Sequence, residues 1–353
     1  MENPLGLRGI EFVEFAGPDP EKLHRLFVAF GFSRELWHPT RGQDLYRQGS
    51  MFFILNRGSP ASSASSAASS LASRFVTAHG ASVPAMGWRF DQPSHAQELA
   101  VSRGARKIEN GDYRGVPAIE GIGGSTIYLT PAESRGTAYY EELGFVPHPK
   151  PVTIESKGFL AIDHLTNNVE RGTMAKWAEF YKQIFGFVEI RYFDIRGAKT
   201  GLTSFALKSP CGTFCIPINE GTESKSQINE YLEEYKGPGV QHIAFLTKDI
   251  LSSLECLDGT GIQTLDIDDD YYAEVYNRVP GVTEDKEEIR KRNVLVDGDA
   301  EGYLLQIFTK NVIGPIFFEI IQRKNHHSFG EGNFTALFRS IERDQMKRGY
   351  LKA

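Results

Sequence analysis

Three side chains that can bind a metal ion lie on separate strand-like segments in the second half of the chain. His164 and His242 each stand near the start of an apolar segment, and Glu319 interrupts the apolar run of residues 316–321. An unpaired carboxylate in such a run would be costly. Two imidazoles and one carboxylate form the facial triad that binds Fe(II) and leaves coordination positions open. The three residues therefore predict a mononuclear iron site.

Each of these residues also has an ordinary interpretation. A single strand histidine is more often a hydrogen-bonded core residue than a ligand, and Glu319 alone could pair with Arg323 or Lys324 at a sheet edge. Their occurrence on equivalent strands of equivalent units favours a shared site. His326 and His327 lie in a polar, Gly-rich loop and are interpreted as solvated surface.

The segments that must position the three candidate ligands repeat one pattern with changes in sequence. In the first half, strand-like alternation over residues 10–17 is followed by helical periodicity over residues 19–30. In the second half, residues 162–169 and 173–185 repeat that order. The sequence therefore predicts a β-α-β-β-β module used about four times, with two modules in each half.

The two helices carry matching end signals, but the two halves differ at the candidate ligands. Asp19 and Thr173 are suited to cap the first helical turn. Gly31 and Gly186 follow the last turn, where a positive φ is wanted. At the strand positions equivalent to His164 and His242 the first half has Phe12 and Gly87, so a metal is expected only in the second half.

Helices packed on curved, mostly antiparallel sheets predict an α+β fold of two similar domains. Residues 147–152, PHPKPV, are interpreted as an extended connector. We therefore expect a ligand-free N-terminal domain over residues 1–150, serving as a scaffold or assembly surface. The catalytic domain is expected over residues 151–353.

Two further segments have a distinct character. Residues 59–73 are almost entirely Ser and Ala and are expected to form a flexible surface insertion. Near the C-terminus, helical spacing places four apolar residues on one face and Arg339, Glu342, Arg343 and Asp344 on the other. The apolar residues are Phe334, Leu337, Phe338 and Ile341. This amphipathic helix is expected to cover something apolar and to close the site.

Composition excludes several classes of protein. Over 353 residues, 41% are hydrophobic and 12% aromatic, which is too apolar for a disordered chain. A net charge of −6 argues against a nucleic-acid binder. No apolar stretch approaches the ~20 residues of a membrane helix, and the N-terminus lacks an export signal. Three cysteines give no disulfide framework and are assigned to packing. We expect a cytoplasmic protein that binds neither nucleic acid nor membrane.

Five motifs of the second half carry a family resemblance. They are IDHLTNNV (162–169), GVQHIAF (239–245), LLQIFTK (304–310), FFEIIQR (317–323) and FGEGNF (329–334). With these motifs the chain resembles the 4-hydroxyphenylpyruvate dioxygenase family, closely in the second half and in outline in the first. That family has the vicinal-oxygen-chelate fold, whose paired β-α-β-β-β modules agree with the repeat.

The resemblance implies a specific activity. It implies that His164, His242 and Glu319 hold one Fe(II) per chain, which the 2-oxo acid group of the substrate chelates. The substrates would be 4-hydroxyphenylpyruvate and O2. Loss of CO2, hydroxylation of the ring and migration of the side chain would give homogentisate, a step of tyrosine and phenylalanine catabolism. The resemblance also implies a homo-oligomer, a dimer or a tetramer.

The resemblance further implies a set of substrate-binding residues. The polar ones are Ser204, Asn219, Gln227, Gln241, Gln306 and Asn333, and the aromatic ones are Phe308, Phe317, Phe329 and Phe334. Strand alternation supports part of this set, because residues two apart share a face. Gln241 is adjacent to His242, and in a regular strand it would point the other way. For Phe334, packing within the core is the alternative to contact with the substrate.

Three other functions remain open at this point. A 4-hydroxymandelate synthase would share the triad and the substrate, but the segment 216–219, IPIN, resembles the dioxygenase version. A non-catalytic small-molecule-binding or resistance protein of the same fold would not need the triad. An extradiol ring-cleaving dioxygenase would need a catalytic base for which the sequence shows no clear candidate.

Overall fold

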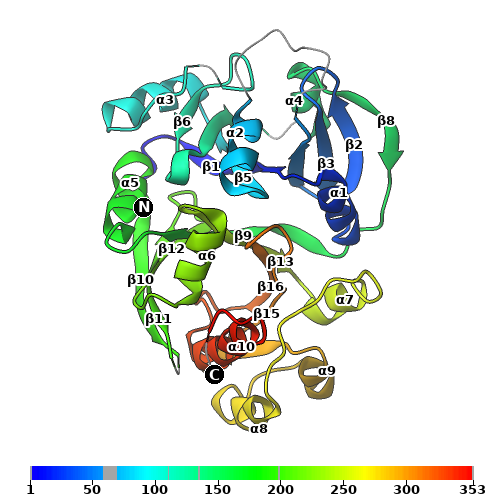
Figure 1. The fold of residues 1–353 in the computed structure, drawn as a ribbon, viewed down its shortest axis with the longest axis vertical. Helices are drawn as coiled ribbons and strands as arrows, with labels where there is room; N and C mark the ends of the chain where they lie inside the picture. Colours follow the sequence, from blue (N-terminus) through cyan, green and yellow to red (C-terminus); the bar gives the residue numbers. More distant parts are fainter. Residues whose placement is uncertain (1, 59–69, 110, 134–135, 198, 352–353) are drawn as a thin grey trace.

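The computed structural model describes residues 2–58, 70–109, 111–133, 136–197 and 199–351. Within these ranges, each half of the chain forms one curled, eight-stranded sheet with helices packed on it (Figure 1). Four strand pairs are parallel and the others are antiparallel, so the sheets are mixed. The predicted α+β class, with two similar units, is confirmed.

The first sheet has the strand order β6-β7-β5-β1-β4-β3-β2-β8. Its elements, with a 3₁₀ turn at Ile122–Gly124, are β1 (Leu7–Ala16), α1 (Pro20–Ala29), β2 (Ser33–His38), β3 (Gln43–Gln48), β4 (Met51–Asn56), α2 (Leu71–His79), β5 (Ser82–Phe90), α3 (Pro93–Ser102), β6 (Ala118–Glu120), β7 (Thr126–Pro131), α4 (Thr137–Glu142) and β8 (Val146–Val152).

The second sheet has the strand order β10-β11-β12-β9-β13-β16-β15-β14. Its elements, with a 3₁₀ turn at Glu331–Asn333, are β9 (Phe159–Val169), α5 (Met174–Phe185), β10 (Val188–Arg196), β11 (Gly201–Lys208), β12 (Cys215–Gly221), α6 (Gln227–Tyr235), β13 (Gly239–Thr247), α7 (Ile250–Glu255), α8 (Asp269–Arg278), α9 (Lys286–Lys291), β14 (Leu295–Gly298), β15 (Tyr303–Phe308), β16 (Phe317–Lys324) and α10 (Phe334–Lys347).

The expected connector is itself a strand. β8 covers residues 147–152, which are extended as predicted, and it pairs with β2 in the first sheet. Its prolines are tolerated because β8 lies at the edge of the sheet, where strand N–H groups need no partner. The junction between the halves therefore belongs to the first sheet.

The helix ends agree with the sequence in three of four places. Asp19 accepts a hydrogen bond from the backbone N–H of Lys22, and Gly31 and Gly186 have φ of +87° and +81°. Thr173 is not a side-chain cap, because its hydroxyl donates to the carbonyl of Glu170. The Glu220 carboxylate, from β12, accepts instead from the backbone N–H of Met174, the first residue of α5.

The remaining segments show two more differences. Residues 59–69 of the Ser/Ala stretch lie outside the described residues. The stretch ends earlier than expected, because the Ser70 hydroxyl caps α2 and residues 71–73 are its first turn. In α10, Glu342 does not face solvent as predicted. It is buried, and its carboxylate accepts from the backbone of Lys199 and Thr200.

The two faces of the second sheet have different functions. Phe245 on β13 and Phe318 on β16 point toward the first half, where the ring of Phe30 packs edge-on against Phe318 at 4.8 Å. Phe32 also contacts Phe245. Because side chains alternate along a strand, the neighbouring residues of β13 and β16 face the opposite side. That opposite face is left free for a site.

None of the helices in the described ranges has the length and apolar character that crossing a membrane takes.

Candidate metal centre and its cavity

The three candidate ligands lie on three adjacent strands at one level of the second sheet. Ala244 on β13 is paired with His164 on β9 and with Glu319 on β16. Residues paired across neighbouring strands point to the same face, and His242 joins them because it is two residues from Ala244. The small methyl group of Ala244 leaves the space between the larger side chains open.

The ligand atoms of the triad are close together and buried. Nε2 of His164 lies 3.0 Å from Oε2 of Glu319 and 3.3 Å from Nε2 of His242. Nε2 of His242 lies 3.4 Å from the same carboxylate oxygen. All three side chains are buried, and one potential ligand atom of each lies within 4.8 Å of the other two. This arrangement is suited to hold a metal ion.

The triad also determines its own protonation in the absence of metal. Burial alone would disfavour the charge on His164, but the carboxylates of Glu319 and Asp163 outweigh it and raise its pKa to about 9. Burial alone would raise the pKa of Glu319, but His164 lowers it well below its usual range. Burial lowers the pKa of His242, which is therefore neutral. One imidazolium and one carboxylate balance each other in the site.

A β-bulge explains how Gln241 reaches the site beside His242. Val240 pairs with Asn167 and His242 pairs with Thr166, so Gln241 has no partner on β9. The extra residue in the bulge breaks the alternation of sides, and both side chains line the same cavity. The Gln241 side-chain oxygen lies 3.0 Å from Nδ1 of His242. The expectation from regular alternation, that Gln241 points away, is wrong.

The triad lies in the wall of a cavity between the sheet and α10. Every residue predicted for the site except Asn333 lines this cavity, namely His164, Ser204, Asn219, Gln227, Gln241, His242, Gln306, Phe308, Phe317, Glu319, Phe329 and Phe334. The cavity combines a polar wall on the strands with a largely apolar cover.

Unpaired polar atoms mark where this cavity can accept a ligand. Gln306 is buried, and among the described residues neither the oxygen nor the nitrogen of its amide has a hydrogen-bond partner. The amide nitrogen of Asn219 makes long contacts, at 3.3 and 3.4 Å, to Asn168 and Gln241. Buried polar groups are normally satisfied, so groups left without a partner beside a cavity indicate that a polar ligand completes them.

Asn333 is placed elsewhere. Its side-chain oxygen accepts from the hydroxyl of Tyr271, at 2.7 Å, and from the guanidinium of Arg278. It is fully buried just before α10, and these contacts hold the start of that helix against α8. Its position supports a structural role, because it does not line the cavity.

Eight residues that line the cavity were not among the predicted site residues. The additional residues are Thr166, Phe193, Ile195, Leu202, Pro217, Leu337, Phe338 and Ile341. The last three belong to the apolar face predicted for α10. Thr166, Leu202 and Pro217 each lie two residues from a predicted site residue on the same strand, so strand alternation could have found them. Phe193 and Ile195 share one face of β10, which none of the motifs reaches.

Comparisons with known proteins point consistently to one family. Residues 1–143 match the family model described as "Hydroxyphenylpyruvate dioxygenase, HPPD, N-terminal", and residues 161–289 match the "Glyoxalase/Bleomycin resistance protein/Dioxygenase superfamily". Protein MelA of Shewanella colwelliana is 50% identical, with 99% of each chain covered. A 4-hydroxyphenylpyruvate dioxygenase of Legionella pneumophila is 43% identical over 355 residues, covering 99% of this chain and 98% of the relative.

A solved structure extends the likeness to the fold. A triple mutant of 4-hydroxymandelate synthase from Streptomyces coelicolor superposes with a TM-score of 0.80 at 25% identity, covering 96% of this chain and 99% of the other. Paired modules around a buried His/His/Glu set define a metal-dependent enzyme of the vicinal-oxygen-chelate fold. Within that class the chain belongs to the 4-hydroxyphenylpyruvate dioxygenase family, and it is an oxidoreductase of the dioxygenase type.

Proposed function

We propose that the chain converts 4-hydroxyphenylpyruvate and O2 to homogentisate and CO2, using one Fe(II) held by His164, His242 and Glu319. The observation that carries the proposal is the buried triad in the wall of a cavity with unpaired amide groups. The full-length similarity to relatives named 4-hydroxyphenylpyruvate dioxygenase supports this substrate. The step belongs to the breakdown of tyrosine and phenylalanine.

The residues present fit Fe(II). The triad offers two imidazole nitrogens and one carboxylate oxygen, a donor set that suits this ion and leaves positions open for other ligands. When bound, the iron supplies the site at which the 2-oxo acid group and O2 meet and at which the oxygen is activated. The carboxylate of Glu319 offsets part of the charge of the ion inside a buried site.

The strand residues orient the substrate by their polar groups. Ser204 and Asn219 are paired across β11 and β12 and present a hydroxyl and an amide on the same face. With Gln241 they form the polar wall beside the triad. Gln306, on β15, supplies an unpaired amide from the other side, and Gln227 lines the cavity from the first turn of α6. These groups would bind the polar ends of the substrate.

Aromatic side chains hold the ring of the substrate and keep water out. The ring of Phe317 stacks on that of His242 with centroids 4.8 Å apart, and Phe308 lies beside it. Phe334 packs against Phe193, so it has core contacts in addition to its place in the cavity wall. A dry, apolar enclosure limits side reactions of an activated oxygen species.

The wider organisation follows from these assignments. Residues 151–353 would be the catalytic domain, and residues 1–150 a ligand-free scaffold that also serves assembly into a dimer or tetramer. In the first half the ring of Phe12 fills the space beside Gly87, where a Cβ would collide with it. This packing leaves no room for a histidine at position 87. Three cysteines without disulfide bonds support a cytoplasmic location.

Oxygen uptake with Fe(II) and 4-hydroxyphenylpyruvate, followed by identification of the product, tests the proposal. Homogentisate with one CO2 per O2 is the expected result. Hydroxymandelate as the product would show that the chain shares the substrate but not the reaction, and would contradict the proposal. Iron bound at the triad without any oxygen uptake would contradict the proposed substrate.

A further inference from the structure

Asp163, the residue before the first histidine ligand, faces that ligand although the two are neighbours on one strand. Ile162 pairs with Phe245 and His164 pairs with Ala244, so Asp163 is the unpaired residue of a second β-bulge. Its Oδ2 lies 2.7 Å from Nδ1 of His164, while Nε2 of the same ring points to Glu319. The bulge thus places a carboxylate on the ring nitrogen that faces away from the ligand cluster.

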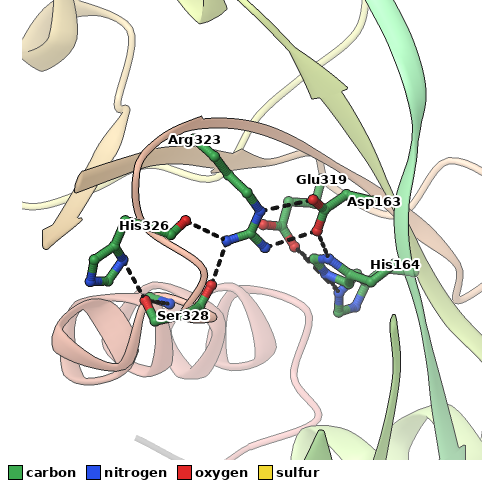
Figure 2. Close-up of polar contacts among 8 residues, drawn as sticks. Asp163, His164, Glu319, Arg323, His326 and Ser328 are labelled. Carbon is green, nitrogen blue, oxygen red and sulfur yellow. Dashed lines mark hydrogen bonds and ion pairs between the residues drawn. The ribbon is translucent and has the colours of Figure 1, made fainter. Parts of the chain in front are cut away.

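Arg323, on β16, holds the carboxylate of Asp163 (Figure 2). Its Nε donates to Oδ1 of Asp163 at 2.8 Å and its Nη2 donates to Oδ2 at 2.9 Å, which is a two-point contact. The ion pair is well shielded, with exposed side-chain fractions of 14% for Arg323 and 13% for Asp163. Arg323 lies four residues after Glu319 on β16, so both ligand strands are tied to the same guanidinium group.

The remaining arm of Arg323 binds the turn that follows β16. Nη1 donates to the backbone carbonyls of His326, at 3.2 Å, and Ser328, at 2.6 Å. The hydroxyl of Ser328 lies 2.8 Å from Nδ1 of His326, so this histidine is part of a local network and not solvated surface as expected. Figure 2 shows the guanidinium between the Asp163 carboxylate and this turn.

The same turn delivers an aromatic residue to the metal cavity. Phe329 follows Ser328 directly, and its ring lies edge-on to the ring of His164 with centroids 5.5 Å apart. The Arg323 guanidinium carbon is 5.9 Å from the centre of that ring. One arginine therefore touches both the support of a ligand and the residue that packs over that ligand.

From these contacts we infer that Asp163 and Arg323 are positioning residues of the metal centre. They hold His164 with Nε2 toward the metal, and they couple this orientation to the turn of residues 326–329 and hence to Phe329. The inference rests on the proposed metal site. A ligand histidine commonly donates its second ring N–H to a carboxylate, which fixes the ring and increases its basicity. Here the Asp163 carboxylate is itself fixed by the two-point contact with the guanidinium group of Arg323. The ammonium group of a lysine cannot form this contact.

The test uses two conservative variants and one control in the full-length protein. Arg323→Lys keeps the charge but loses the two-point contact and the carbonyl contacts, and Asp163→Asn keeps the shape but loses the charge. Arg343→Lys is the control, because Arg343 pairs with Asp268 and with the backbone of Asp266, away from the triad. Each protein is measured for Fe(II) affinity, by anaerobic competition with a chelator, and for amide hydrogen exchange in residues 326–330.

We expect Arg323→Lys and Asp163→Asn to weaken Fe(II) binding about 10- to 100-fold and to speed amide exchange in the turn. The control should bind Fe(II) within twofold of the wild type. Affinity in Arg323→Lys within twofold of the wild type would overturn the inference and leave the proposed function standing. Weaker Fe(II) binding with unchanged amide exchange in the turn would show that the ligand orientation is not coupled to the turn. A wild-type protein that binds no Fe(II) would contradict the proposed function itself.

Discussion

At the scale of single residues, the candidate metal centre depends on a carboxylate that is buried but not isolated. Glu319 lies in an apolar strand, and its charge is balanced by the imidazolium of His164 in the absence of metal. Removal of one member of such a buried set leaves the others without compensation. Packing alone would favour an apolar side chain at this position, so the carboxylate indicates a binding role.

Glu319→Ala should therefore lose both iron and turnover. A missing ligand is expected to lower Fe(II) affinity by more than about 100-fold, beyond the effect of outer-shell changes. Metal analysis after desalting and oxygen uptake measure the two losses. Glu284→Gln is the control, since that carboxylate pairs with Lys324 outside the cavity. An active Glu319→Ala protein with full iron content would contradict the assignment.

A second buried carboxylate, Glu14, belongs to the half without ligands. It accepts hydrogen bonds from the Asn56 amide, at 2.8 Å, and the Tyr113 hydroxyl, at 2.9 Å. Burial, with Asp112 nearby, raises its pKa from 4.5 to about 7. Between these values the folded chain holds a proton that the unfolded chain releases. The free energy of unfolding therefore falls as the pH rises through this window.

Glu14→Gln should remove this dependence on pH. Between pH 4.5 and pH 7.5 the wild type is expected to lose on the order of 3 kcal/mol of stability relative to the variant. Urea unfolding at both pH values measures the difference, and each protein serves as its own reference at the lower pH. Parallel pH profiles for the two proteins would show that Glu14 is not protonated in the folded state.

At the scale of elements, strand alternation supported part of the site that the family resemblance implied, and it failed where strands are irregular. The motifs around His242 and Glu319 correctly indicated separate strands, and α10 was predicted from its apolar spacing. The orientations of Gln241 and Asp163 could not be predicted, because each depends on a bulge in the pairing of β9 with β13. A bulge depends on the register between distant segments, which one sequence does not reveal.

The anchoring of α10 was missed for a similar reason. Glu342 lies on the polar side of the helical pattern, but one of its carboxylate oxygens accepts three hydrogen bonds, from the N–H groups of Lys199 and Thr200 and from the Thr200 hydroxyl, all at 3.0 Å. Periodicity identifies which residues share a face, but not which neighbouring turn will cover that face. The contact holds α10 against the turn between β10 and β11.

Glu342→Ala should loosen α10 over the cavity. Removing an acceptor shared by three donors is expected to destabilise the protein by about 2 kcal/mol and to raise the oxygen consumed per homogentisate formed. Thermal unfolding and the ratio of oxygen to product measure these effects. Glu342→Gln retains an acceptor oxygen and should recover part of both. Normal stability and coupling in the alanine variant would mean that α10 is held by its apolar face alone.

At the scale of the whole molecule, the two halves share one aromatic core. Phe245 contacts Phe30, Phe32 and Phe53 of the first half, with ring centroids 5.9 to 6.1 Å apart. The same strand, β13, carries His242 on its other face. The metal centre is thus built on a sheet whose back is covered by the ligand-free half, which gives that half a structural function.

Phe245→Ala should destabilise the entire molecule. Truncation of a buried phenylalanine typically costs about 3–5 kcal/mol. Calorimetry should show one transition at a clearly lower temperature, because both halves lose the same contact. Tyr192→Ala, at a ring that is 51% exposed on β10, should change stability by less than about 0.5 kcal/mol. An unchanged transition in Phe245→Ala would show that the halves are stable independently.

Whether iron at the triad supports the reaction can be tested by titrating the metal-free protein with Fe(II). At each step, the initial rate of homogentisate formation from 4-hydroxyphenylpyruvate and O2 is measured. We predict that the rate rises linearly and reaches a plateau at one iron per chain, and that Glu319→Ala shows no rise. A full rate without added iron, or the same titration curve for Glu319→Ala, would contradict this prediction.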